Sequence, residues 1–92
     1  MEKKLYNAIC VENTDNVVVV TESIQKGQVI RFAADHGAQE EITALEDIPV
    51  YHKAARYDIS PDAPVLKYGN PIGKALRAIA RGTYVHVHNL GS

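Results

Sequence analysis

The sequence predicts a mostly β protein, made of short bent strands with at most one or two short helical turns. Short runs rich in β-branched and aromatic residues alternate with clusters of turn-forming residues. No stretch of ten or more residues keeps its apolar side chains at the 3.6-residue period of a helix. A seven-residue frame that combines a turn with the start of a strand also recurs along the chain.

Four strands and one helical turn are predicted from local patterns. Residues 5–11 and 16–21 predict a hairpin, because residues 12–16 between them are dense in turn formers. The four valines at 17–20 predict a strand that is buried on both faces. Further strands are predicted at 28–32 and 39–45, joined by a turn at Asp35-His36-Gly37, and residues 75–80 predict a helical turn.

The recurring frame occurs at residues 24–30, 59–65 and 79–85. Each copy begins with an isoleucine, has a turn residue three positions later, and ends with a β-branched residue three positions beyond that. The turn residues are Gly27, Asp62 and Gly82, which suit a positive φ. Each copy is therefore predicted to bury its isoleucine, turn, and start a strand. The irregular spacing of the copies favours a compact fold over a solenoid.

Size and composition describe one globular domain that spans residues 1–92. Apolar residues make up 46% of the chain and charged residues 23%. A chain of this size buries roughly 60–65% of the surface that it exposes when unfolded. The formal net charge of −1 is too close to neutral to favour a nucleic acid or an anionic membrane as a partner.

The predicted location is the cytoplasm. The N-terminus has charged residues but no apolar segment typical of a signal peptide, and no apolar run approaches the ~20 residues of a membrane span. The single cysteine, Cys10, excludes a disulfide within the chain and fits a reducing compartment. We interpret Cys10 as a small buried hydrophobic residue rather than a reactive thiol.

The last third of the chain carries the candidate chemistry. Residues 67–92 contain four basic residues, two histidines and no acidic residue. This composition predicts a site for an anionic ligand, or for a metal ion that binds an anionic ligand. Residues 83–88 alternate like a strand, which predicts that His86 and His88 share one face, about 6–7 Å apart. They could ligate a metal, or bind and protonate a leaving group. The alternative is a pair of polar strand residues without function.

Other candidates would bind an anionic substrate. Lys67 and Lys53 could each pair with a carboxylate, although exposed strand lysines usually serve only solubility. Tyr68 is expected to be half-buried, with its hydroxyl at the rim of the site. His52 could be a third metal ligand, and Asn89 could orient a histidine or a ligand, or simply end the strand.

Several motifs in a fixed order resemble a known family. The frame Ile-x-x-Gly-x-x-Val/Ile resembles the signature of the SAF domain, a β-clip of short bent strands. The order of motifs across residues 52–89 is similar to that in the SAF domain of altronate and galactarate dehydratases. It is also similar to the separate small-subunit form, as in sulfolactate sulfo-lyase. Tyr51, Asp62 and Ala78 depart from the family pattern, which usually has Gly, Gly and Asp there.

The resemblance implies a lyase that acts on a sugar acid or related 2-hydroxy acid with the help of a divalent metal, usually iron. Most catalytic groups of this family lie in a larger domain or subunit, so the chain is expected to be a small accessory subunit. The roles assigned are catalysis or metal binding for His86 and His88, and substrate binding for His52, Lys53, Lys67, Tyr68 and Asn89.

The expected partners are a larger catalytic subunit and an anionic small molecule. Homo-oligomer formation stays open, as does the choice between water and sulfite as leaving group. The alternative function is a non-catalytic SAF module that binds carbohydrate or protein, because a fold does not fix a function.

Overall fold

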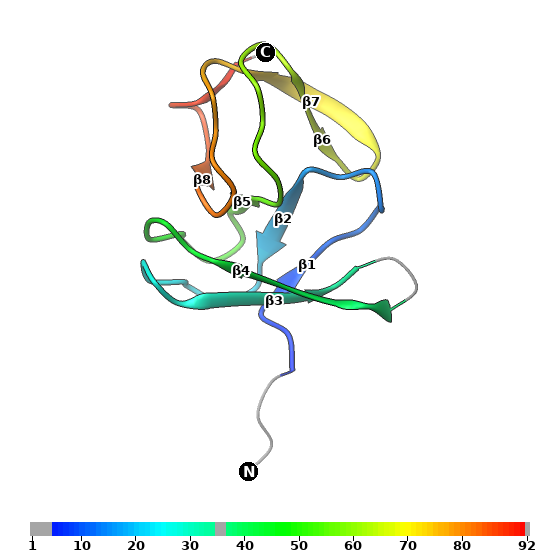
Figure 1. Ribbon diagram of the computed structural model, residues 1–92, viewed down its shortest axis with the longest axis vertical. Helices are drawn as coiled ribbons and strands as arrows, with labels where there is room; N and C mark the ends of the chain where they lie inside the picture. The colour runs from blue at the N-terminus through cyan, green and yellow to red at the C-terminus, as the bar shows by residue number, and fades with distance from the viewer. Residues whose placement is uncertain (1–4, 35–36, 92) are drawn as a thin grey trace.

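The computed structural model describes residues 5–34 and 37–91, and within them it places nine short strands (Figure 1). The strands are β1 (Ala8–Ile9), β2 (Val17–Val20), β3 (Val29–Ala33), β4 (Gln39–Thr43), β5 (Lys53–Ala55), β6 (Pro64–Lys67), β7 (Asn70–Ala75), β8 (Tyr84–Val85) and β9 (Leu90–Gly91). They form antiparallel sheets in the orders β1-β2-β5-β8, β3-β4 and β6-β7-β9. These ranges contain no α-helix, so the mostly β prediction is confirmed. Accordingly, the part of the chain that is described has no helix able to cross a membrane.

The strands predicted in the first half are confirmed. β1 pairs with β2 as a hairpin, and β3 pairs with β4 along the full length of both strands. β2 is buried on both faces as its valines predict, because Val17, Val18 and Val20 are each at most 2% exposed. Two residues of the turn predicted between β3 and β4, Asp35 and His36, lie outside the described residues.

The three predicted corners are also confirmed, and the structure adds a fourth. Gly27, Asp62 and Gly82 adopt φ values of 88°, 67° and 90°, and the isoleucine before each of them is buried. The fourth corner spans residues 48–54 and turns at Tyr51, where φ is 66°. A left-handed backbone costs a residue with a Cβ roughly 1–2 kcal/mol, so tyrosine is not expected there from sequence.

The corners cross in two pairs. Ile24 bridges Ile48, and Ile59 bridges Ile79, each through two backbone hydrogen bonds of 2.8–2.9 Å. In both crossings, the aspartate before one isoleucine accepts a backbone N–H of the partner corner at 2.8 Å. The same arrangement thus occurs twice, once between residues 24 and 48 and once between residues 59 and 79.

Two hydrophobic clusters lie on opposite faces of β2 and β5. Because neighbouring residues of a strand point to opposite faces, Val18 and Ala54 belong to one cluster while Val17 and Ala55 belong to the other. The first cluster is completed by β3 and β4, and the second by β6 and β7. Figure 1 shows β2 between the β3-β4 hairpin below and the β6-β7 hairpin above. The central sheet therefore fixes the positions of both outer hairpins.

The helical turn predicted at residues 75–80 is wrong. Ala75 is the last residue of β7, and Ile79 is paired with Ile59 in the second crossing. So short a segment forms few helical hydrogen bonds, because a helix has a costly nucleus. The two backbone bonds and the buried isoleucine of the crossing favour an extended chain instead.

Gly82→Ala is expected to destabilise the fold far more than Gly27→Ala. Both glycines have φ near +90°, so both substitutions bring a similar backbone cost of roughly 1–2 kcal/mol. A Cβ at Gly82 would lie 2.3 Å from the carbonyl oxygen of Thr43, whereas a Cβ at Gly27 would meet nothing within 4 Å. Urea denaturation of the two variants measures the difference. Equal losses in the free energy of unfolding would contradict this explanation.

Candidate functional site

The structure gathers three histidines around Tyr84. His52 precedes β5 and Tyr84 begins β8, and these two strands are neighbours in the central sheet. The Tyr84 hydroxyl lies 2.6 Å from Nδ1 of His52, and the ring centroids are 5.5 Å apart. The ring of His86 stacks on Tyr84 at 5.5 Å with an 8° angle between the planes, and the ring of His88 lies 5.5 Å away at 50°. The His52 and His86 rings are 5.0 Å apart. We call these four residues the histidine cluster.

His86 and His88 reach the cluster through a turn and not along a strand. The predicted strand at 83–88 is wrong beyond Val85, because residues 86–89 turn and the N–H groups of Asn89 and Leu90 both donate to the His86 carbonyl. Asn89 is 3% exposed and closes this turn from inside. Its Oδ1 accepts the backbone N–H of His86 at 3.0 Å, and its Nδ2 donates to the Tyr84 carbonyl at 2.9 Å. These bonds replace the strand pairing that residues 86–88 would otherwise need.

The electrostatic surroundings of His86 disfavour its charged form. Partial burial lowers the pKa of His86 most, and the nearby His52, Lys53 and His88 lower it further. One acidic group also lies here, since Oε2 of Glu46 accepts the backbone N–H of Tyr84 at 3.3 Å. An anion bound beside His86 would oppose these positive neighbours and favour the protonated imidazole.

Lys53 lies near Lys67. Burial lowers the pKa of Lys53 most, and the positive charge of Lys67 lowers it further. The Lys67 ammonium lies 4.8 Å from the ring centroid of Tyr68. Tyr68 is 51% exposed, so its side chain is more exposed than the half-buried position that was predicted. Two neighbouring ammonium groups repel each other, so a carboxylate placed between them would be held by both.

A buried carboxylate holds the turn that carries Lys67 and Tyr68. Tyr68 and Gly69 both have positive φ, at 56° and 78°. Asp15, which is 1% exposed, accepts the backbone N–H groups of Tyr68 at 3.0 Å and of Gly69 at 2.8 Å. The same carboxylate accepts the N–H of Glu12 at 3.1 Å. Asp15 therefore couples the β1–β2 turn to the turn that presents Lys67.

Two of the four basic residues counted in the last third of the chain donate to backbone carbonyls. Arg77 donates to the His88 carbonyl through Nη2. Arg81 donates through Nε to the Arg56 carbonyl at 3.1 Å, and through Nη2 to the Glu41 carbonyl at 3.0 Å. The candidate anion site therefore rests on Lys53, Lys67 and the histidine cluster.

Tyr84 was missed by the sequence reasoning, although a signal for it was present. Tyr84, His86 and His88 alternate along the chain, and the same pattern that selected the histidines includes the tyrosine. Asp15 and Arg56 were also missed. Both are 1% exposed, and only the fold brings their partners to them.

The described part of the chain does not form a metal site by itself. It contains no group of three or more His, Cys, Asp or Glu side chains placed to hold a metal ion. Nδ1 of His52 is already in contact with the Tyr84 hydroxyl, which leaves one nitrogen of that ring for a metal. A catalytic zinc site, for comparison, typically has three protein ligands.

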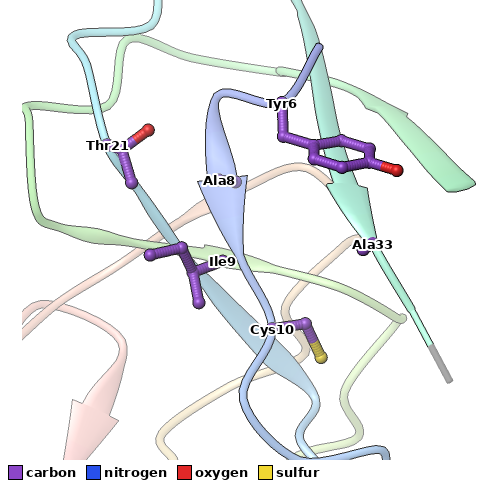
Figure 2. A pocket seen from close by; sticks show the side chains of 6 residues that line it. All are labelled: Tyr6, Ala8, Ile9, Cys10, Thr21 and Ala33. Atoms are coloured by element: carbon purple, nitrogen blue, oxygen red, sulfur yellow. The ribbon is translucent and has the colours of Figure 1, made fainter. Parts of the chain in front are cut away.

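A pocket of about 350 Å³ lies away from the histidine cluster (Figure 2). Its lining is mainly apolar and comprises Tyr6, Ala8, Ile9, Cys10, Thr21 and Ala33. Cys10 is partly and not fully buried, and its Sγ donates to the Glu12 carbonyl at 3.3 Å. Burial raises the pKa of the Cys10 thiol, which keeps it protonated and agrees with an unreactive cysteine.

Comparison with known proteins identifies the family. The family model described as the altronate/galactarate dehydratase SAF domain matches residues 6–92. The chain belongs to this family. This SAF domain is 35% identical over 74 residues to (2R)-sulfolactate sulfo-lyase subunit alpha of Chromohalobacter salexigens. The aligned region covers 79% of this chain and 79% of that subunit.

The same SAF domain also matches a small part of longer proteins. It is 40% identical over 75 residues to altronate dehydratase of Escherichia coli. This aligned region makes up 82% of this chain but only 14% of that protein. It is 34% identical over 77 residues to galactarate dehydratase (L-threo-forming) of Escherichia coli, again 14% of that protein. The predicted relationship to the dehydratases and to the small sulfo-lyase subunit is confirmed.

Proposed function

We propose that this SAF domain is the small accessory subunit of a carbon–oxygen or carbon–sulfur lyase that acts on a sugar acid or a related 2-hydroxy acid. The observation that carries the proposal is the match to a sulfo-lyase alpha subunit across 79% of both chains. The site supports it independently. Lys53 and Lys67 lie near each other, and Lys53 also lies near His86 of the histidine cluster, which has both donors and acceptors for protons.

The partner in this proposal is a larger catalytic subunit in the cytoplasm. In the dehydratases, the matched region is 14% of the protein, so most of each relative lies outside the matched region. The incomplete ligand set of the histidine cluster supports the same conclusion. A divalent metal, which we expect to be iron(II), would take most of its ligands from the larger subunit and would polarise an oxygen of the substrate.

The residues of this chain would bind the anion and move one proton. Lys53 and Lys67 hold the substrate carboxylate, with Tyr68 at the rim. A base of the larger subunit removes the proton from C2, and the electron pair of that bond forms the C2–C3 double bond as the C3 substituent leaves. His86 or His88 gives the leaving group its proton, and the resulting enol becomes a 2-keto acid. Asn89 keeps His86 in place through the turn.

Anion binding is expected to raise the pKa of His86 and to become tighter as the pH falls. The free-protein pKa lies below the ordinary value of about 6.5, through burial and positive neighbours. A bound anion adds an attractive charge, so the complex holds the proton to higher pH than the free protein does. Affinity then rises with decreasing pH between the two pKa values. NMR titration of the His86 ring with and without substrate tests this, and an unchanged or lower pKa would contradict it.

A tagged pull-down from the native extract tests the proposed function. The eluate is identified by mass spectrometry and assayed with ferrous iron for 2-keto acid formation from altronate, galactarate and sulfolactate. A larger co-purifying chain and activity on one acid are expected, and release of sulfite would identify the leaving group. A protein that is recovered alone and inert would favour a non-catalytic binding module instead.

A further inference from the structure

Tyr84 contacts more of the candidate site than any single histidine does. Among the described rings of the cluster, it lies 5.5 Å from His52, from His86 and from His88. Its hydroxyl oxygen lies 2.6 Å from Nδ1 of His52, at the short end of hydrogen-bond distances. None of the roles assigned above to the histidines and lysines uses this contact.

The backbone of Tyr84 is fixed on both sides. Its N–H donates to Oε2 of Glu46 at 3.3 Å, and its carbonyl accepts Nδ2 of Asn89 at 2.9 Å. Within the central sheet it is paired with Ala54 of β5, and its ring packs against the first hydrophobic cluster. A tyrosine side chain has only two rotatable bonds between its backbone and its ring. The fixed backbone and the packed ring therefore determine where the hydroxyl lies.

The direction of this hydrogen bond is tied to the tautomer of His52, because a tyrosine hydroxyl can donate to an unprotonated Nδ1 or accept from a protonated one. In a neutral imidazole one ring nitrogen donates and the other accepts. When Tyr84 donates to Nδ1, the proton of His52 is on Nε2 at the other edge of the ring. His52 is only partly buried and its ring lies 5.0 Å from that of His86, so this N–H can reach a ligand that also contacts His86.

We propose that Tyr84 is a positioning residue that fixes His52 as the Nε2–H tautomer and thereby makes it a hydrogen-bond donor to the anionic substrate. The identity of the ligand in this inference rests on the proposed function, whereas the tautomer of His52 does not depend on it. His52 then binds an oxygen of the substrate in the ground state, next to the proton-transferring His86. Loss of the Tyr84 hydroxyl should therefore weaken binding more than it slows the chemical step.

The first test measures the tautomer directly. Long-range ¹H–¹⁵N correlation NMR on the ¹⁵N-labelled full chain distinguishes a protonated Nδ1 from a protonated Nε2. We expect Nε2–H in the wild type and a mixture of tautomers in Tyr84→Phe, which keeps the ring contacts. Tyr57→Phe is the matched control, because Tyr57 lies over Arg56 at 4.8 Å and should leave the His52 signals unchanged. A wild-type Nδ1–H tautomer, or no change in Tyr84→Phe, would overturn the proposal.

The second test uses the reconstituted complex. Tyr84→Phe should raise KM roughly 5-fold, as the loss of one hydrogen bond allows, with kcat little changed. His52→Gln, whose amide nitrogen falls near the Nε2 position, should bind substrate better than His52→Asn, whose amide falls near Nδ1. The reverse order, or an unchanged KM in Tyr84→Phe, would exclude the proposed role. A wild-type complex without lyase activity would refute the proposed function, and the tautomer measurement would still decide the Tyr84–His52 contact.

Discussion

Arg56→Leu is expected to destabilise the protein by about 3–5 kcal/mol, which is a large part of the 5–15 kcal/mol that holds a typical domain folded. Arg56 is 1% exposed, and its Nε and Nη2 donate to the two carboxylate oxygens of Glu40 at 3.2 and 2.9 Å. Its Nη1 donates to the carbonyls of Asn13 and Asp15 at 2.9 and 3.1 Å. The leucine would leave those carbonyls without this donor, and such groups are costly when buried. The Glu40 carboxylate, whose side chain is 30% exposed, would lose its partner but keep access to water.

The expected loss is large because Arg56 joins separate parts of the fold. It follows β5, Glu40 belongs to β4, and the two carbonyls belong to the turn between β1 and β2. The guanidinium also lies over the ring of Phe32 in the first hydrophobic cluster, 5.7 Å from its centroid. A single substitution therefore releases contacts to three elements at once.

The exposed pair Arg31–Glu41 provides the matched control for this prediction. It also involves a glutamate of β4 and links that strand to β3 at 2.8 Å, but its side chains are 46% and 49% exposed. Surface ion pairs contribute about 0–1 kcal/mol, so Arg31→Leu should change the free energy of unfolding by no more than that. Both variants can be measured by urea denaturation at neutral pH. Similar losses for Arg31→Leu and Arg56→Leu would show that burial of the pair is not what stabilises the fold.

Local rules predicted β1 to β4, the starts of β6 and β8, and three of the four corners. A buried isoleucine followed by Gly or Asp at a positive φ is a short-range pattern, and Gly27, Asp62 and Gly82 follow it. The corner at Tyr51 breaks the rule, because its φ of 66° is held by tertiary contacts such as its N–H bond to the Val20 carbonyl at 2.8 Å. No propensity of tyrosine indicates that contact.

The sequence located the candidate residues better than it predicted their arrangement. Alternation selected His86 and His88, yet both reach Tyr84 through a turn that depends on the buried amide of Asn89. His52 and Tyr84 are 32 positions apart and meet only because β5 pairs with β8. Whether a charged side chain faces a ligand or a carbonyl depends on such long-range contacts, which one sequence does not reveal.

His86→Ala should reduce the turnover of the reconstituted lyase about 100-fold or more, because a positioned proton donor typically contributes 10²–10⁴-fold to the rate. The fold should survive the change, since the turn at residues 86–89 is held by backbone groups and by the Asn89 amide and not by the imidazole. Val87→Ala is the control within the same turn, because Val87 is 76% exposed and should leave kcat unchanged. If the proton comes from His88 instead, His88→Ala will show the large loss and His86→Ala a smaller one. Wild-type turnover in both histidine variants would remove the histidine cluster from the chemistry and leave the anion-binding lysines as the functional part of this subunit.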